Sequence, residues 1–519
     1  MNIRPLAFLI LIFLGFSINS FAQNIDLIGQ LKYKEELSSI WGYTSPEGKE
    51  YALVGTVNGT SIVNISIPAQ PKEIHYIKGP SGYWREIKTW KNYAYIVHDN
   101  SSTEIGVTIV DLSNIDTSIQ TFNFKGPNNN LYRAHTLFIS EKGYLYLFGG
   151  SKSGAVIFNL NYNPTKPEYL GFTSNEYIHD GFIQNDTLWA SNVYEGYISV
   201  WDVKDPSFPT KITQFYTPGR FTHNSWLSDN GQTLFTTDEK NATTVAAFDI
   251  SDLTDIKLLD EFKIRPDEQS IPHNVHVLND YLVLSHYTEG VVIADASDPS
   301  NIVLAGHYDT SPKFSGGGFY GCWGIYPYFK SELIIASDIE TGLYILQPHY
   351  KRASKWKGII YDSQTLLPIN QAKVSISDSE YIYTTNFDGD YKIGTIETGT
   401  IQLKVIADQY QEKILTFEIN TDSNIVHDIY MDAIPTNIRN NENLIHIFQV
   451  NQASISFQLR EKSPNAQVLL YNSQGQLVDN KKIENALDHT IYWSFLPSGI
   501  YFIQIQTPEN CITKKVYKN

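Results

Sequence analysis

The sequence predicts an all-β protein: a seven-bladed β-propeller followed by two small β-sandwich domains. Three observations predict this fold. One unit of strand-like segments recurs seven times within residues 24–350, at a mean spacing of about 47 residues. Each unit holds runs rich in Val, Ile, Tyr and Phe, broken by Gly, Asn, Asp and Pro, which indicates four short strands. The last unit lacks its fourth strand, and the start of the chain supplies one.

The units are recognised by a Trp or His at the start of the first strand. Residues 197–203 are a typical third strand, in which successive side chains alternate between two faces. Asp205-Pro206 then turns the chain, because proline cannot donate to a strand ladder. The seven predicted starts are Trp41, Trp84, His135, His179, His223, His273 and Trp323.

The seventh unit predicts how the ring closes. Its third strand ends near Leu346, and no fourth strand follows. Residues 27–31 resemble the fourth strands at residues 169–172 and 304–307, each with a Gly at the matching place. We therefore expect the N-terminal strand to complete the last blade, which leaves no open sheet edge in the ring.

The N-terminus predicts a secretory signal peptide over residues 1–22. Arg4 supplies the positive charge, residues 6–16 are apolar, and Ala22 precedes the expected cleavage site. The apolar run is too short to span a membrane, and no later run is longer, so no transmembrane segment is expected. The mature protein is expected outside the cell or at its surface, after passage through the periplasm.

Composition limits the class of partner. The chain has 519 residues and a formal net charge of -16, so a nucleic-acid partner is not expected, because binding phosphates needs a basic face. The two cysteines, Cys322 and Cys511, fall in different predicted domains, so no structural disulfide is expected.

A first small domain is predicted over residues 355–433. It contains several strand-like runs, and Asp388-Gly389 predicts a hairpin turn. The order of these runs resembles the carboxypeptidase regulatory-like domain. That resemblance implies an accessory, non-catalytic role.

The last domain is predicted over residues 444–519. Residues 468–478 predict a hairpin, and a Gly-Ile-Tyr-Phe-Ile strand at residues 499–503 precedes a basic end. This pattern resembles the C-terminal sorting domain of the type IX secretion system in Bacteroidetes-type bacteria, although its Pro-Asn-Pro box is absent. The resemblance implies the type IX export machinery as a partner, and cleavage of the tail during export.

Motifs in the ring resemble the choice-of-anchor B family. Its LVIVD-type repeats read Val-Thr-Ile-Val-Asp at residues 107–111 and Val-Val-Ile-Ala-Asp at 291–295. Trp-Arg-Glu-Ile-Lys at 84–88, Thr-His-Asn-Ser-Trp-Leu at 222–227, Pro-His-Asn at 272–274 and Trp-Gly-Ile-Tyr-Pro-Tyr-Phe at 323–329 follow the family's order. The resemblance implies a secreted or surface location, and no established reaction.

The phase of the repeat predicts one functional rim. In a propeller blade the first strand lines the axis and the second runs antiparallel to it, so the start of the first and the end of the second share a rim. Four histidines start first strands, and Trp41, Trp84 and Trp323 are expected in the equivalent places. The second strands end at Asp99, Glu195, Glu239, Glu289 and Glu340.

Imidazole and carboxylate groups around one opening predict a divalent metal site or a general base. The alternative is that each His bonds to the backbone of the neighbouring blade and only fixes blade packing. The predicted metal ligands are His135, His179, Asp180, His223 and His273.

Four further residues are candidates for ligand binding. Trp84 and Trp323 would either stack on a sugar ring or pack around the axis. Arg85 and Arg133 would pair either with an acidic ligand or with carboxylates of the protein itself.

Three functions remain open at this point. The first is a secreted or surface propeller that binds an extracellular ligand or protein. The second is an extracellular metal-dependent hydrolase with its site at the His-lined mouth. The third is a purely structural surface protein, in which changes to the histidines leave surface attachment intact.

Overall fold

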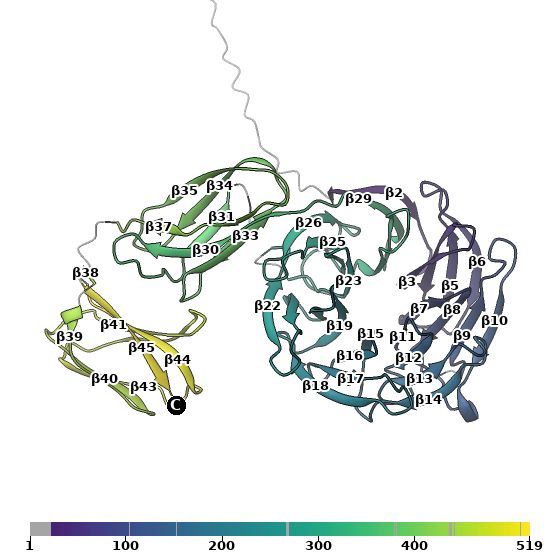
Figure 1. The fold of residues 1–519 in the computed structure, drawn as a ribbon, viewed down its shortest axis with the longest axis horizontal. Coiled ribbons are helices and arrows are strands. Elements are labelled where there is room, and N and C mark those ends of the chain that lie inside the picture. The colour runs from purple at the N-terminus through teal and green to yellow at the C-terminus, as the bar shows by residue number, and fades with distance from the viewer. Residues whose placement is uncertain are drawn as a thin grey trace, which may run out of the picture.

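The computed structural model describes residues 22–102, 104–151, 153–265, 269–377, 379, 381–434, 439–440, 442–508 and 510–518. These residues form strands and two short 3-10 turns, η1 (Pro127–Asn129) and η2 (Glu442–Leu444), and no α-helix (Figure 1). None of the described helical segments is long and apolar enough to cross a membrane. Residues 1–21 of the predicted signal peptide lie outside the described residues.

Seven antiparallel sheets form the predicted propeller. Blades 1 to 3 follow chain order from the inner to the outer strand. Blade 1 contains β3 (Leu37–Thr44), β4 (Glu50–Thr56), β5 (Gly59–Asn64) and β6 (Lys72–Lys78); blade 2 contains β7 (Arg85–Trp90), β8 (Tyr93–His98), β9 (Val107–Asp111) and β10 (Gln120–Phe124); blade 3 contains β11 (Thr136–Ile139), β12 (Tyr144–Phe148), β13 (Val156–Asn159) and β14 (Glu168–Phe172).

Blades 4 to 6 repeat this order, and blade 6 gains a fifth strand, β1 (Ala22–Gln23), at its outer edge. Blade 4 contains β15 (Asp180–Gln184), β16 (Thr187–Asn192), β17 (Tyr197–Asp202) and β18 (Thr210–Tyr216); blade 5 contains β19 (Thr222–Leu227), β20 (Thr233–Asp238), β21 (Val245–Asp249) and β22 (Lys257–Phe262); blade 6 contains β23 (Asn274–Leu278), β24 (Tyr281–His286), β25 (Gly290–Asp295) and β26 (Val303–Tyr308).

Blade 7 joins the two ends of the ring. It contains β27 (Cys322–Tyr326), β28 (Ile334–Asp338) and β29 (Gly342–Pro348), and its outer strand is β2 (Ile25–Leu31). β2 pairs antiparallel with β29, with Leu31 opposite Leu343. The N-terminal strand therefore closes the ring as the sequence predicts.

A glycine explains why the closing strand resembles other fourth strands. A Cβ atom on Gly29 would lie 2.0 Å from the backbone oxygen of Pro68, in the turn of blade 1. A Cβ on Gly171 of blade 3 would meet the backbone oxygen of Pro206 in blade 4 at 2.9 Å. At both places the fourth strand of one blade packs closely on the proline turn of the next, and only glycine leaves room for it.

The last residue of the LVIVD motif has a local role in the turns after third strands. Asp111, Asp202, Asp249 and Asp295 each accept a hydrogen bond from the backbone N–H two residues later. Such Asx turns stabilise a tight reversal without a glycine. Hydrophobic side chains between these turns fill the space between blades, as where Phe235 of blade 5 shares a core with Val275 and Leu284 of blade 6.

Two β-sandwiches follow the ring (Figure 1). In the first, the turn at Asp388-Gly389 connects strands of different sheets, so the hairpin predicted there is wrong. One sheet orders β33 (Asp390–Thr395), β30 (Ser354–Asp362) and β36 (Asn424–Val426), and β37 (Ile429–Met431) pairs with β30 as well. The other sheet orders β32 (Ile382–Thr384), β31 (Lys373–Ile376), β34 (Gly399–Ile406) and β35 (Lys413–Ile419).

The second sandwich contains the predicted hairpin at residues 468–478, formed by β41 (Gln467–Asn472) and β42 (Leu477–Lys482). Both cysteines are free thiols. The remaining strands are β38 (Arg439–Asn440), β44 (Gly499–Gln506) and β45 (Asn510–Lys518) in the same sheet, and β39 (Ile445–Val450), β40 (Ser454–Leu459) and β43 (Asp488–Tyr492) in the facing one.

Closure at Gly29 gives a testable prediction. Gly29→Val should lower the free energy of unfolding by about 1–3 kcal/mol, because the added side chain forces the closing strand away from Pro68. Urea unfolding of the full chain measures the change. Ile28→Thr, at an exposed position of the same strand, should change it by less than about 0.5 kcal/mol. Equal stability of Gly29→Val and the wild type would contradict this view of closure.

Candidate functional site

The predicted rim carries a ring of side chains at the start of the first strands. We call Ser38, Trp84, His135, His179, His223, His273 and Trp323 the mouth ring. Successive ring centroids lie 4.3 Å apart from His135 to His179, and 4.5 Å apart in the next two steps. Trp84 and Trp323 extend the arc at its two ends, 6.3 and 5.1 Å from the nearest imidazole. The four histidines therefore form one continuous arc.

The place predicted for Trp41 is wrong. Ser337 of blade 7 donates to the backbone oxygen of Ser38 at 2.5 Å, just as Thr237 of blade 5 donates to that of His273 at 2.7 Å. Ser38 is thus the mouth-ring residue of blade 1. The register of β3 against β4 skips two residues between Leu37 and Ile40, and this larger bulge obscures the alignment in the sequence.

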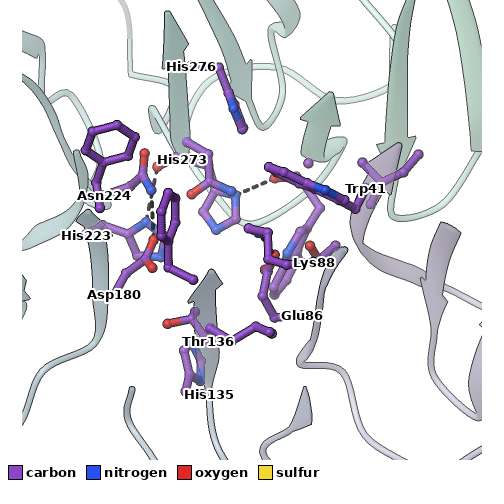
Figure 2. Close-up of a pocket in the computed structure, with 18 of the residues that line it drawn as sticks. Trp41, Glu86, Lys88, His135, Thr136, Asp180, His223, Asn224, His273 and His276 are labelled. Carbon is purple, nitrogen blue, oxygen red and sulfur yellow. Dashed lines mark hydrogen bonds and ion pairs between the residues drawn. The ribbon is translucent and has the colours of Figure 1, made fainter. Parts of the chain in front are cut away.

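Trp41 belongs to a second layer, three residues farther along each first strand. We call Trp41, Phe138, Phe182, Trp226 and His276 the aromatic floor. Its rings contact one another from blade to blade, with Trp226 4.5 Å from Phe182 and 4.6 Å from His276. Figure 2 shows Trp41 and His276 among the residues that line this part of the channel. This layer could have been found in the sequence, since an aromatic ring recurs three residues after most mouth-ring positions. Aligning only the first residue of each repeat did not reveal it.

Bonds between blades fix the tautomer of two histidines. Nδ1 of His223 lies 3.1 Å from the backbone oxygen of His273, and Nδ1 of His273 bonds to that of Trp323. A carbonyl oxygen only accepts, so each Nδ1 carries the hydrogen. In a neutral ring, Nε2 is then left with a free lone pair. The packing role and the ligand role weighed for these histidines thus use different nitrogens.

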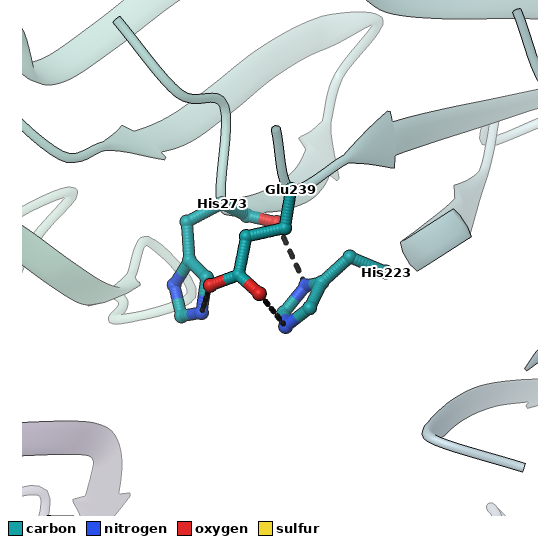
Figure 3. A group of neighbouring side chains, drawn as sticks. All are labelled: His223, Glu239 and His273. Carbon is teal, nitrogen blue, oxygen red and sulfur yellow. Dashed lines mark hydrogen bonds and ion pairs between the residues drawn. The ribbon is translucent and has the colours of Figure 1, made fainter. Parts of the chain in front are cut away.

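Glu239 lies between these two free nitrogens (Figure 3). Its carboxylate oxygens are 3.6 Å from Nε2 of His223 and 3.5 Å from Nε2 of His273. These separations exceed those of N–H···O hydrogen bonds. The ligand atoms of the three residues all lie within 4.8 Å of one another. Two ligands held about 2.1 Å from one tetrahedral ion are about 3.4 Å apart, so the spacing suits a divalent metal.

Asp180 lies outside this group. Its carboxylate accepts a hydrogen bond from Asn224 at 2.8 Å and another from the backbone of Gly181. Burial raises the pKa of Asp180. Glu239 therefore takes the carboxylate place that the sequence had assigned to Asp180. Tyr287 donates to Glu239 at 2.6 Å and orients its carboxylate.

His135 has a different partner. Its Nδ1 lies 2.9 Å from Asp99, which also pairs with Arg133. Burial opposes ionisation of Asp99, but the contacts with His135 and Arg133 prevail and lower its pKa. Among the other second-strand ends, Glu289 pairs with Arg265 and His307, Glu340 accepts from a backbone N–H, and Glu195 is exposed. None of the three pairs with a mouth-ring histidine.

The buried imidazoles are neutral near pH 7. Burial, reinforced by the neighbouring histidines, holds the pKa of His179 and of His223 well below the usual value, and burial also lowers the pKa of His273. Nε2 of His179 is buried and has no hydrogen-bond partner. Neutral rings with free nitrogens are the form in which histidine binds metals or accepts a proton.

The four ligand-binding candidates are two tryptophans at the mouth and two arginines that have partners within the protein. Trp84 is exposed at the mouth, while Trp323 packs edge-on against His273. Arg85 is buried and donates to the backbone oxygens of Thr56 and Pro80, and Arg133 pairs with Asp99. Both arginines thus have partners within the protein.

Comparisons with known proteins identify two parts of the chain. The LVIVD repeat matches residues 81–119 and 272–310, and the secretion system C-terminal sorting domain matches residues 449–519. No curated protein sequence matches the chain. The crystal structure of the computationally designed protein Ika8 is 9% identical, with a TM-score of 0.41 over 62% of this chain and 98% of its own. That likeness carries no inference about function.

The aromatic floor contains a histidine whose titration can be measured. Burial, reinforced by Lys88, lowers the pKa of His276 from 6.5 to about 3. Below pH 6.5 the unfolded chain therefore binds a proton that the folded chain does not, and stability falls as the pH falls. Lowering the pH from 7.5 to 5.0 therefore reduces the free energy of unfolding by about 2 kcal/mol through His276.

His276→Gln should remove that share of the pH dependence. We expect the loss of unfolding free energy between pH 7.5 and 5.0 to be about 2 kcal/mol smaller than in the wild type, measured by urea unfolding. Tyr328→Phe removes a hydroxyl 3.3 Å from His276 but keeps the titrating ring, so it should retain the wild-type slope. The same slope in His276→Gln and the wild type would refute the assignment.

Proposed function

We propose that this protein is an exported propeller protein that binds an extracellular ligand at its His-lined mouth, where His223, Glu239 and His273 hold a divalent metal. One observation carries the proposal. Two imidazole lone pairs face the carboxylate of Glu239 at 3.5–3.6 Å. Three acceptors directed at one another repel unless a cation lies between them. Two nitrogens and one carboxylate suit zinc or iron(II), and leave coordination positions for a ligand.

The sorting domain implies export to the cell surface or the extracellular space, and contact with the type IX machinery. We further propose that residues 1–22 are a signal peptide and that residues 355–433 act as a carboxypeptidase regulatory-like spacer. Motifs and strand order support these assignments, as they support membership of the choice-of-anchor B family. Asp295 of blade 6 holds the segment that leads into residues 355–433, because it accepts hydrogen bonds from the side chain of Arg352 at 2.9 Å and the backbone of Ala353 at 2.7 Å.

Metal-assisted hydrolysis is a second candidate function. The observation that favours it is the unpartnered Nε2 of His179, whose ring is 4.5 Å from that of His223. A neutral imidazole beside a metal is suited to act as a general base.

Metal analysis of the purified full chain tests the proposal. After incubation with zinc and removal of unbound ions, we expect about one zinc per chain, because two neutral imidazoles and a carboxylate form one site. His223→Ala and Glu239→Gln should each reduce the content to below about 0.1 per chain, since either change leaves too few ligands. Inductively coupled plasma mass spectrometry gives the stoichiometry.

His307→Ala is the matched control. Nε2 of His307 lies 3.6 Å from Glu289, a similar His–Glu pair in blade 6, but the two belong to no three-ligand group among the described residues. We expect its zinc content to equal that of the wild type. A wild-type chain without bound zinc, or equal losses in His307→Ala and His223→Ala, would reject the site.

A further inference from the structure

We propose that the ligand of the mouth is a neutral carbohydrate, whose pyranose rings stack on aromatic side chains around the rim. This deepens the proposed function and rests on its claim that the mouth binds a ligand. Six large hydrophobic side chains are exposed in the described segments that lead into first strands or leave second strands, and all six are aromatic. We call them the aromatic collar: Tyr83, Trp84, Tyr132, Tyr194, Phe319 and Tyr320.

The collar is joined to the mouth ring by ring contacts. Tyr194 is 72% exposed and lies 4.9 Å from Tyr177, which is 6.3 Å from His179. Trp84 is 47% exposed and lies 6.3 Å from His135. Aromatic faces thus lead from the surface toward the imidazole arc on two sides of His135 and His179, whose rings are 4.3 Å apart.

A third path reaches the opposite end of the arc. Phe319 is 57% exposed and packs edge-on at 5.4 Å against Tyr287, and Tyr287 lies 4.8 Å from His273. Tyr287 is also the residue that donates to Glu239. The collar therefore borders the proposed metal ligands as well as the His135 side of the mouth.

Polar groups lie beside the exposed rings. His135 lies beside Trp84, its Nδ1 is 2.9 Å from Asp99, and Asp99 pairs with Arg133. Asp99 and Arg133 are partly exposed and offer acceptors and donors side by side. A sugar ring presents C–H groups on its faces and hydroxyls at its edge, so it matches aromatic faces flanked by such polar pairs.

The make-up of the collar favours a sugar over a protein partner. The core of a protein interface is continuous and largely apolar, with Met and other apolar side chains beside the aromatic ones. The described rim segments expose no Leu, Ile, Val or Met to the same degree. The net charge of -16 and the carboxylates at the mouth disfavour acidic glycans, which leaves neutral ones.

Calorimetric titration of the full chain tests the inference. The probes are cellohexaose, xylohexaose, β-mannohexaose and laminarihexaose, with an alginate hexasaccharide as the acidic comparison. We expect at least one neutral probe to bind, and Trp84→Ala and Tyr194→Ala each to weaken that binding about tenfold or more. Tyr162→Ala is the matched control, because Tyr162 is 83% exposed but lies between β13 and β14 on the opposite rim. This variant should bind the neutral probe as tightly as the wild type does.

The outcomes separate this inference from the metal site. Zinc content is measured on the same samples, and Trp84→Ala should retain it. Bound zinc without binding of any neutral probe would overturn the carbohydrate inference alone. Sugar binding that Trp84→Ala weakens, in a chain without zinc, would support the inference and reject the metal. Binding of alginate only, or equal losses in Tyr162→Ala and Trp84→Ala, would also overturn it.

Discussion

The hydrogen bond from one blade to the backbone of the next is the constraint on which the mouth depends. At His223 and His273 the donor is the ring nitrogen Nδ1 itself, and at Thr237 and Ser337 a hydroxyl serves the same purpose. A ring of seven sheets requires every blade to be held at a fixed angle to its neighbours. The histidines meet that requirement with one nitrogen, and the other is directed toward Glu239. Fold and function therefore use the same residues without competing for the same atoms.

Burial determines what those free nitrogens can do. A desolvated imidazole resists protonation, so the rings stay neutral and keep their lone pairs near pH 7. The same desolvation makes an unpartnered nitrogen such as Nε2 of His179 costly unless a ligand satisfies it. Below the mouth the rings of the aromatic floor pack on one another from blade to blade, and above it exposed rings and the Asp99–Arg133 pair face solvent. The chain thus arranges an apolar layer, a neutral ligand-rich layer and a stacking rim in order along one axis.

The sequence revealed the fold more completely than the site. The sevenfold repeat, and the glycines found at matching places in the strands that contain residues 29 and 171, were sufficient to predict the ring and its closure. Strand periodicity and close backbone packing both restrict which residue types can occur, so both can be recognised in the sequence. The phase of the repeat also brought the four histidines to one rim. The phase of the repeat misplaced Trp41, since a β-bulge shifts the strand register without changing the composition of the strand. The sequence also predicted Asp180 as the carboxylate ligand in place of Glu239. The direction of each carboxylate depends on partners that are distant in sequence: Asn224 binds Asp180, and Tyr287 binds Glu239.

Anomalous X-ray diffraction from crystals of the zinc-loaded protein, recorded on both sides of the zinc absorption edge, tests the central claim most directly. The account predicts one strong anomalous peak about 2.1 Å from Nε2 of His223, Nε2 of His273 and an oxygen of Glu239, with both Nδ1 atoms still bonded to the neighbouring blade. A map with no peak there, and with Glu239 hydrogen-bonded directly to the imidazoles at less than about 3.2 Å, would contradict it.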